Sequence, residues 1–114
     1  MPSTSIATAQ ITTAGNIAYA SVGNTAITWL SICNYSTNTV TANVYVVPSG
    51  NTLGNTNIIL ANLVLTSGNA GHGGGDTYQL YNAAEKLLLG NGDSIQISAN
   101  ANSAITVVTS YTSI

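Results

Sequence analysis

Residues 39–47 read TVTANVYVV, and this stretch decides the fold class. Apolar and polar residues alternate along it with a period of two, which is the pattern of a β-strand with one buried face. The residues expected on the buried face are Val40, Ala42, Val44 and Val46. The residues expected on the opposite face are Thr39, Thr41, Asn43 and Tyr45.

The same alternation occurs twice more towards the C-terminus. DSIQISA (93–99) places Ile95, Ile97 and Ala99 on one face. A further stretch has Ile105 and Val107 on one face and continues towards Thr109 and Tyr111. Other segments are rich in β-branched or aromatic residues and are bounded by Gly, Asn or Ser, which is typical of strands. These segments are 5–11, 16–20, 25–34, 57–67 and 76–81.

Turn-forming residues separate these short segments. Pro48, Ser49 and Gly50 end one strand, and GNGD (90–93) predicts a tight reversal before another. NAAEKLL (82–88) is the one helix candidate, barely two turns long, and a strand beginning at Lys86 is the alternative. We therefore expect an all-β fold: an antiparallel two-sheet β-sandwich of seven or eight strands, jelly-roll-like or immunoglobulin-like.

One domain is expected over residues 1–114, because neither a linker nor an internal repeat divides the chain. Residues 1–15 are polar apart from Ile6 and Ile11. They are expected either to form a strand or to act as an N-terminal arm that pairs with a neighbouring subunit. The start, MPSTSIATAQ, has no positive region and no apolar run, which predicts folding in a cytoplasm and no membrane anchor.

Charged residues make up only 4% of the chain, against about 25% in typical soluble domains. They are Asp76, Glu85, Lys86 and Asp93. One lysine and no arginine cannot neutralise a nucleic-acid backbone, so DNA and RNA are not expected as partners. Strand edges are usually guarded by charges or proline, and this chain has almost none. We therefore expect its edges and apolar faces to be covered by copies of itself or by a larger assembly.

The glycine-rich stretch GNAGHGGG (68–75) lacks the partners that phosphate or metal chemistry requires. A phosphate-binding loop ends in Lys-Ser or Lys-Thr and opens a helix, whereas Asp76 and Thr77 follow here. His72 and Asp76 give at most two metal ligands. We interpret the stretch as a structural loop and keep a partner contact as the alternative, with Gly71, His72, Gly73 and Asp76 as candidate contact residues.

Neither an enzyme nor a cofactor is expected. Glu85 lies beside Lys86, as a solvated charge does, and Asp93 lies in a turn that it helps to form. We therefore do not expect these carboxylates to form a catalytic pair. Cys33 is the only cysteine and is expected to be a small buried hydrophobe, because a nucleophile needs a base and only His72 could serve.

The aromatic residues allow two interpretations. Trp29 is expected in the core or at a subunit contact, with the tyrosines at sheet edges. Alternatively, Tyr35 and Tyr45 form an aromatic platform for sugar rings if they share an exposed face, and Tyr78 is a further candidate contact.

Three stretches carry a resemblance to a known family. SICN (31–34), VYVVPSG (44–50) and LLLGNGDSIQISANANSAITVVTSYTSI (87–114) resemble small β-sandwich virion proteins of tailed bacteriophages. The similarity covers roughly residues 26–114, and GDSIQ followed by a final strand is its strongest part. The loop GNAGHGGG is longer and richer in glycine than the family pattern.

The resemblance implies a non-enzymatic structural role in the virion. It favours a capsid cement or decoration protein, assembled in the host cytoplasm, that sits as a homotrimer on the outside of the head and contacts the major capsid protein. The alternative is a tail, neck or fibre-associated module, either structural or binding host glycans.

Deleting Gly73 to Gly75 is expected to leave thermal stability nearly unchanged, because loop length affects closure entropy only weakly. Thermal unfolding followed by circular dichroism checks this. A collapse of the melting temperature would mean that the loop is packed against the domain.

Overall fold

The computed structural model describes residues 4–13, 15–66, 77–80, 87–102 and 104–114. Within these residues the chain forms nine β-strands and no helix. The strands are β1 (Thr4–Gln10), β2 (Asn16–Ala20), β3 (Thr25–Asn34), β4 (Val40–Val47), β5 (Ile58–Leu65), β6 (Thr77–Leu80), β7 (Leu87–Leu89), β8 (Ser94–Ala99) and β9 (Ile105–Ser113).

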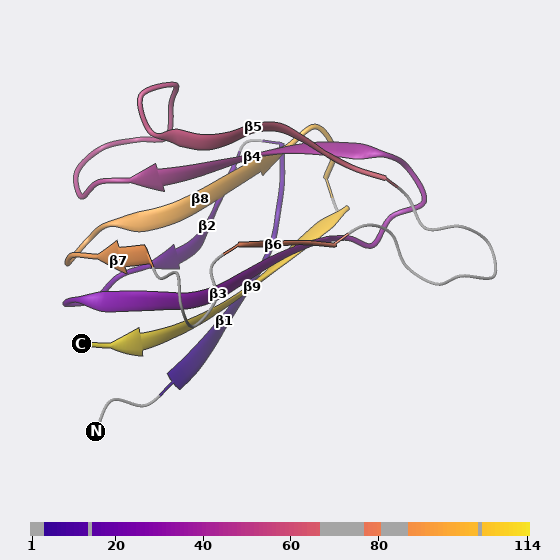
Figure 1. Cartoon of the computed structure of the whole chain (residues 1–114). Coiled ribbons are helices and arrows are strands. Elements are labelled where there is room, and N and C mark those ends of the chain that lie inside the picture. Colours follow the sequence, from indigo (N-terminus) through magenta and orange to yellow (C-terminus); the bar gives the residue numbers. More distant parts are fainter. Residues whose placement is uncertain (1–3, 14, 67–76, 81–86, 103) are drawn as a thin grey trace.

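The strands form two antiparallel sheets that lie face to face (Figure 1). The sheet that we call sheet A has the order β1-β9-β3-β6, and β7 also pairs with β3. The other, sheet B, has the order β2-β8-β4-β5. The two-sheet β-sandwich expected from the sequence is therefore confirmed.

The strand order is that of a jelly roll. Each early strand pairs with a counterpart from later in the chain: β1 with β9, β2 with β8, β3 with β6 and β4 with β5. This pairing is what results when one long hairpin is rolled up into two layers. An immunoglobulin fold would instead pair the first two strands in one sheet, whereas β1 and β2 lie in different sheets here.

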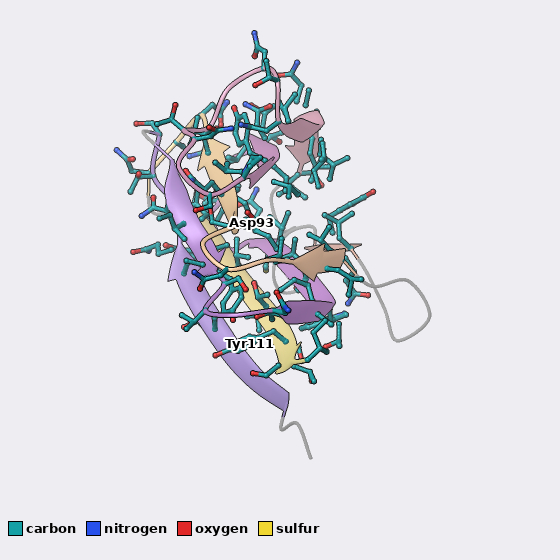
Figure 2. All side chains as sticks on the ribbon, turned by 90° about the vertical axis from the view of Figure 1, so that its left-hand side faces the viewer. Asp93 and Tyr111 are labelled. Atoms are coloured by element: carbon teal, nitrogen blue, oxygen red, sulfur yellow. The ribbon has the colours of Figure 1, made fainter. Side chains whose placement is uncertain are left out.

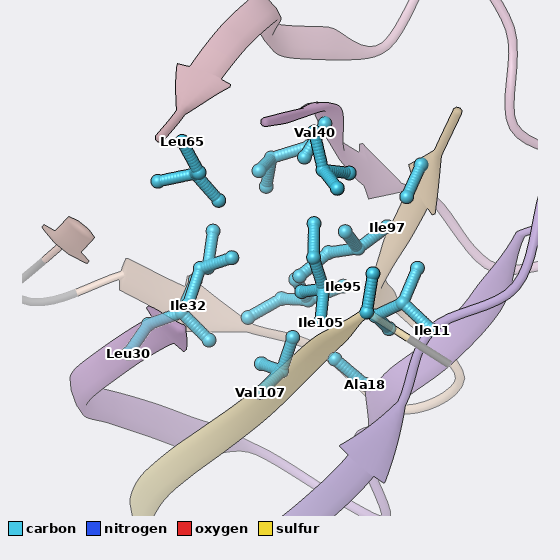
Figure 3. Packing of buried hydrophobic residues seen from close by; sticks show 14 of the residues in the cluster. Ile11, Ala18, Leu30, Ile32, Val40, Leu65, Ile95, Ile97, Ile105 and Val107 are labelled. Atoms are coloured by element: carbon cyan, nitrogen blue, oxygen red, sulfur yellow. The ribbon is translucent and has the colours of Figure 1, made fainter. Parts of the chain in front are cut away.

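Aliphatic side chains from the central strands of both sheets fill the space between them (Figure 3). The predicted alternation is confirmed in β4, where Val40, Ala42 and Val44 are buried in this core and Val46 packs against it. It is also confirmed in β8 and β9. The core residues of those two strands are Ile95, Ile97, Ala99, Ile105 and Val107.

One detail differs from the sequence-based expectations: the strands number nine within the described ranges, not seven or eight. At 82–88, where a helix or a strand beginning at Lys86 was expected, the described residues Leu87–Leu89 form β7, and residues 82–86 lie outside the described part of the chain. Of the two alternatives for the N-terminal residues, residues 4–10 form a strand that pairs with β9 of the same chain, with Ala7 opposite Thr109.

A β-bulge in β3 places Trp29 and Cys33 outside the core, so Cys33 is not the buried hydrophobe expected, and of the two placements expected for Trp29 only the subunit contact is left. The register between β3 and β9 shifts between Ile27 and Trp29, so the inward and outward faces exchange there. As a result Ile27 and Leu30, three residues apart, are both fully buried in the core. Trp29 and Cys33 alternate with core residues, face away from the core and are only half-buried.

A fully buried asparagine joins the two sheets at one end. The Asn34 Nδ2 at the end of β3 donates hydrogen bonds to the backbone oxygens of Asn38 at 2.8 Å and of Leu65, at the end of β5, at 2.9 Å. Its Oδ1 accepts from the Ser36 backbone N–H at 2.9 Å and from the Ser36 hydroxyl at 2.7 Å. The side chain of this sheet A residue thus satisfies backbone groups of β5 in sheet B and of the loop between β3 and β4.

Asn34→Ala is expected to lower the free energy of unfolding by about 2–3 kcal/mol, because it leaves buried backbone groups without partners. Asn55→Ala, at an exposed loop position, is the matched control and should change little. Chemical denaturation measures both. Equal midpoints for the two variants would contradict the structural role of Asn34.

Thr109 is a second polar residue inside the core. Its side chain is fully buried, and its hydroxyl has no hydrogen-bond partner among the described residues. Burying a hydroxyl without a partner is unfavourable.

Thr109→Val should therefore stabilise the protein by about 1 kcal/mol, since it exchanges the hydroxyl for a methyl group of similar size. Thr106→Val, on the other face of the same strand, is the control and should have a smaller effect. A melting temperature that falls for Thr109→Val would show that the hydroxyl is satisfied in solution.

Candidate interaction surface

Only three of the seven predicted contact residues lie in the described part of the chain. Tyr35 follows β3 and is 46% exposed, and Tyr78 on β6 is 36% exposed. Tyr45 on β4 is only 8% exposed. The other four residues lie outside the described ranges: Gly71, His72, Gly73 and Asp76.

The structure does not bring Tyr35 and Tyr45 together on an exposed face. Tyr45 lies in sheet B opposite Gln96, away from the core as the alternation predicted, yet its ring is buried. Tyr35 lies beside sheet A, where its backbone N–H donates to the Ala104 oxygen at 2.9 Å and its hydroxyl bonds with the Gln10 side chain. The sugar platform proposed for these two tyrosines is therefore not formed.

Asp93, labelled in Figure 2, is the one charged side chain among the residues that the structure describes. Its carboxylate accepts hydrogen bonds from the Ser49 and Gly90 backbone N–H groups, each at 2.9 Å. The predicted reversal at 90–93 is confirmed, with the Asp93 N–H donating to the Gly90 oxygen and Gly92 at a positive φ of 87°. The Asp93 carboxylate thus links this turn to the backbone just after β4.

The outer face of sheet A, called the A face below, is the side of that sheet that points away from the core. Ile6 at one edge is 68% exposed and Leu88 at the other edge is 66% exposed. Between them lie the half-buried side chains of Trp29 and Val108. Ser110 is the register partner of both Ile6 and Trp29, so these two residues lie in one row across the sheet.

Apolar side chains are also exposed elsewhere. Ile17, Ile59 and Val64 lie on strands of sheet B, and Val22 lies in the turn before β3. Single exposed apolar residues are normal on proteins. On the A face an aromatic ring and three aliphatic side chains share one sheet surface with neutral polar neighbours. It is therefore a candidate for burial against a partner.

A shallow depression of about 340 Å³ lies in the loop between β4 and β5. Its lining is entirely neutral: Gly50, Asn51, Thr52, Thr56 and Asn57. It has no aromatic ring for stacking and no titratable group. The depression can supply hydrogen bonds but neither of the features that a strong sugar or catalytic site requires.

No cluster of three metal-ligating side chains is present in the described ranges. No helix in this part of the chain is long and apolar enough to cross a membrane. No protein family, curated protein or solved structure matches the chain. The resemblance to phage virion proteins thus depends on the quoted motifs and remains a prediction.

No pattern in the amino-acid sequence predicts which residues form the A face. LLL at 87–89 has no alternation, so its pattern cannot say which leucine points outward. The outward position of Trp29 depends on the bulge in β3, which is a property of pairing with β9.

Proposed function

We propose that this protein is a non-enzymatic structural subunit of a tailed-phage virion, and most specifically a capsid cement or decoration protein. It binds the outer head surface as an oligomer, for which the resemblance implies a trimer, and contacts the major capsid protein. The observation that supports this proposal is the nearly uncharged described surface, which includes exposed apolar side chains on the A face.

A neutral surface suits burial in an assembly. Free-standing proteins stay soluble through interspersed charges and a net charge away from zero. Burying such charges against a partner is costly unless they are paired. The described surface avoids this cost, because Asp93 is its one charged side chain and is already bound to backbone groups. Many neutral contacts repeated by symmetry can then give tight binding through avidity.

The fold is consistent with both candidate functions. Jelly rolls occur in viral capsid proteins and in lectins, so the fold does not choose between a shell protein and a glycan-binding module. The motif resemblance favours the shell protein. The burial of Tyr45 and the lack of aromatic rings in the 50–57 depression weaken the glycan alternative.

Reconstitution tests the proposal. Purified protein is added to expanded heads that lack it, the heads are sedimented, and the pellet is imaged by cryo-electron microscopy. We expect ordered copies on the shell. Protein that stays in the supernatant would contradict the cement function and favour a tail, neck or fibre role, for which a glycan-binding screen with Tyr35→Ala and Tyr78→Ala is the next measurement.

Trp29→Ser is expected to weaken binding to heads on the order of tenfold, because large aromatic side chains supply much of the binding energy of interfaces. Ile17→Ser, on the outer side of sheet B, is the matched control and should bind like the unchanged protein. Titration of heads with each variant, followed by sedimentation, gives the affinities. Equal affinities for the two variants would exclude the A face as the contact surface.

A further inference from the structure

Strand β1 is the one long, regular and unguarded edge in the described part of the sandwich. The edges of sheet A are β1 on one side and β6 with β7 on the other, and those of sheet B are β2 and β5. An edge strand offers unpaired N–H and C=O groups to any other strand unless short length, bulges, charges or proline prevent pairing.

The other edges carry such protection. β6 has four residues and β7 has three. β2 has five residues and an irregularity between Ile17 and Tyr19. β5 is longer, but its register with β4 shifts twice. In β5, Asn62 has a positive φ of 55° and its N–H is bound to the Asn43 side chain at 2.8 Å. Within the described ranges, none of these edges presents a long regular row of free backbone groups.

β1 has no such protection. Its seven residues, TSIATAQ, contain neither a charge nor a proline. All seven pair with β9 in one continuous register, from Thr4 opposite Thr112 to Gln10 opposite Thr106. Among the described residues β1 pairs with no other strand. With respect to these residues, its second edge is open for its whole length.

The hydrogen bond after β1 shows which residues face this open edge. The Ile11 N–H donates to the Ile105 oxygen at 3.0 Å, so Ile11 points its backbone groups towards β9. Successive residues in a strand point their N–H and C=O groups to opposite sides. Ala9 and Ala7 therefore also point towards β9. The residues whose backbone groups point outward are Thr4, Ile6, Thr8 and Gln10.

We propose that β1 pairs antiparallel with β1 of a second copy of this chain about a two-fold axis at Ala7. This register places Ile6 opposite Thr8 of the second copy and Thr4 opposite its Gln10. In each of these pairs both residues have outward backbone groups, so each pair exchanges two hydrogen bonds. Every free N–H and C=O of the open edge then has a partner.

The chemistry of the edge fits a copy of itself. A two-fold contact brings identical surfaces together, so any charge would meet the same charge. β1 has none, and no like-charge repulsion arises. Ala7 at the axis has a small side chain, which suits the close approach of a non-hydrogen-bonded pair. Ile6, exposed in the single chain, gains a β-branched threonine as its cross-strand neighbour.

This pairing would join the A faces of two copies into one continuous surface. The inference deepens the proposed function and rests on its self-association, since a doubled neutral face offers the shell a larger contact area. A two-fold contact builds even-numbered assemblies, in contrast to the trimer that the resemblance implies. The number of copies in the oligomer therefore distinguishes the β1 contact from the trimer.

Thr8→Pro tests the contact, because it removes an outward N–H without removing a hydrogen bond to β9, and proline is tolerated at such edge positions. Thr8→Lys adds a charged guard at the same place. Both variants should raise the dissociation constant of the dimer by about 100-fold or more in sedimentation equilibrium. Circular dichroism and the melting temperature should show that the fold is retained.

Val64→Lys is the matched control, because it adds the same charge at an exposed position on β5, the edge already interrupted by its bulges. It should leave self-association unchanged. Hydrogen exchange adds an independent readout: the Ile6 and Thr8 amides should be protected in the unchanged protein and exposed in Thr8→Lys.

A trimer or monomer of the unchanged protein, or undiminished association of both Thr8 variants with a retained fold, would overturn the β1 contact. A monomer would also remove the self-association that the proposed function includes, whereas binding to the shell is measured separately by the head-binding experiment. Conversely, an even-numbered oligomer that is lost in Thr8→Pro but never binds heads would support the β1 contact and overturn the proposed function.

Discussion

Burial of aliphatic side chains between the two sheets is the constraint on which the rest of this structure depends. The central strands β3, β4, β8 and β9 supply nearly all of the fully buried large side chains. Each sheet has one apolar face that must be covered, and only the other sheet is available to cover it. The jelly-roll pairing satisfies this need, and the fully buried Asn34 of β3 links the two layers at one end by donating to the backbone oxygen of Leu65 in β5.

The outer faces of the two sheets carry almost no charge in the described part of the chain. A sandwich of this kind usually places charged residues on its outer faces and along its edges. Here the outer faces carry Ser, Thr, Asn and Gln together with exposed aliphatic residues, and Asp93 is engaged in a turn. Such a surface is poorly suited to keep a concentrated monomer apart from its copies. It is well suited to become an interior surface of an assembly.

Irregularities in pairing determine which surfaces are available for contact. The bulge in β3 turns Trp29 out of the core and into the A face beside Ile6 and Val108. The irregular registers of β2 and β5 interrupt two of the edges, whereas β1 remains straight and open. Bulges are therefore responsible both for the apolar character of the A face and for the difference between the edges.

The sequence by itself determined the fold class, the strand positions and the core-facing residues of β4, β8 and β9, because a period of two is a local property that every half-buried strand must obey. It also determined the turns at 48–50 and 90–93, in which Gly50 and Gly92 adopt the positive φ that such turns need. Only the tertiary structure decided the strand order, the outward position of Trp29, the burial of Tyr45 and the open edge of β1. These features depend on partners distant in the chain: the pairing of β3 with β9 creates the bulge, and the position of β1 at a sheet edge is set by how the hairpin is rolled. Local alternation carries no information about either.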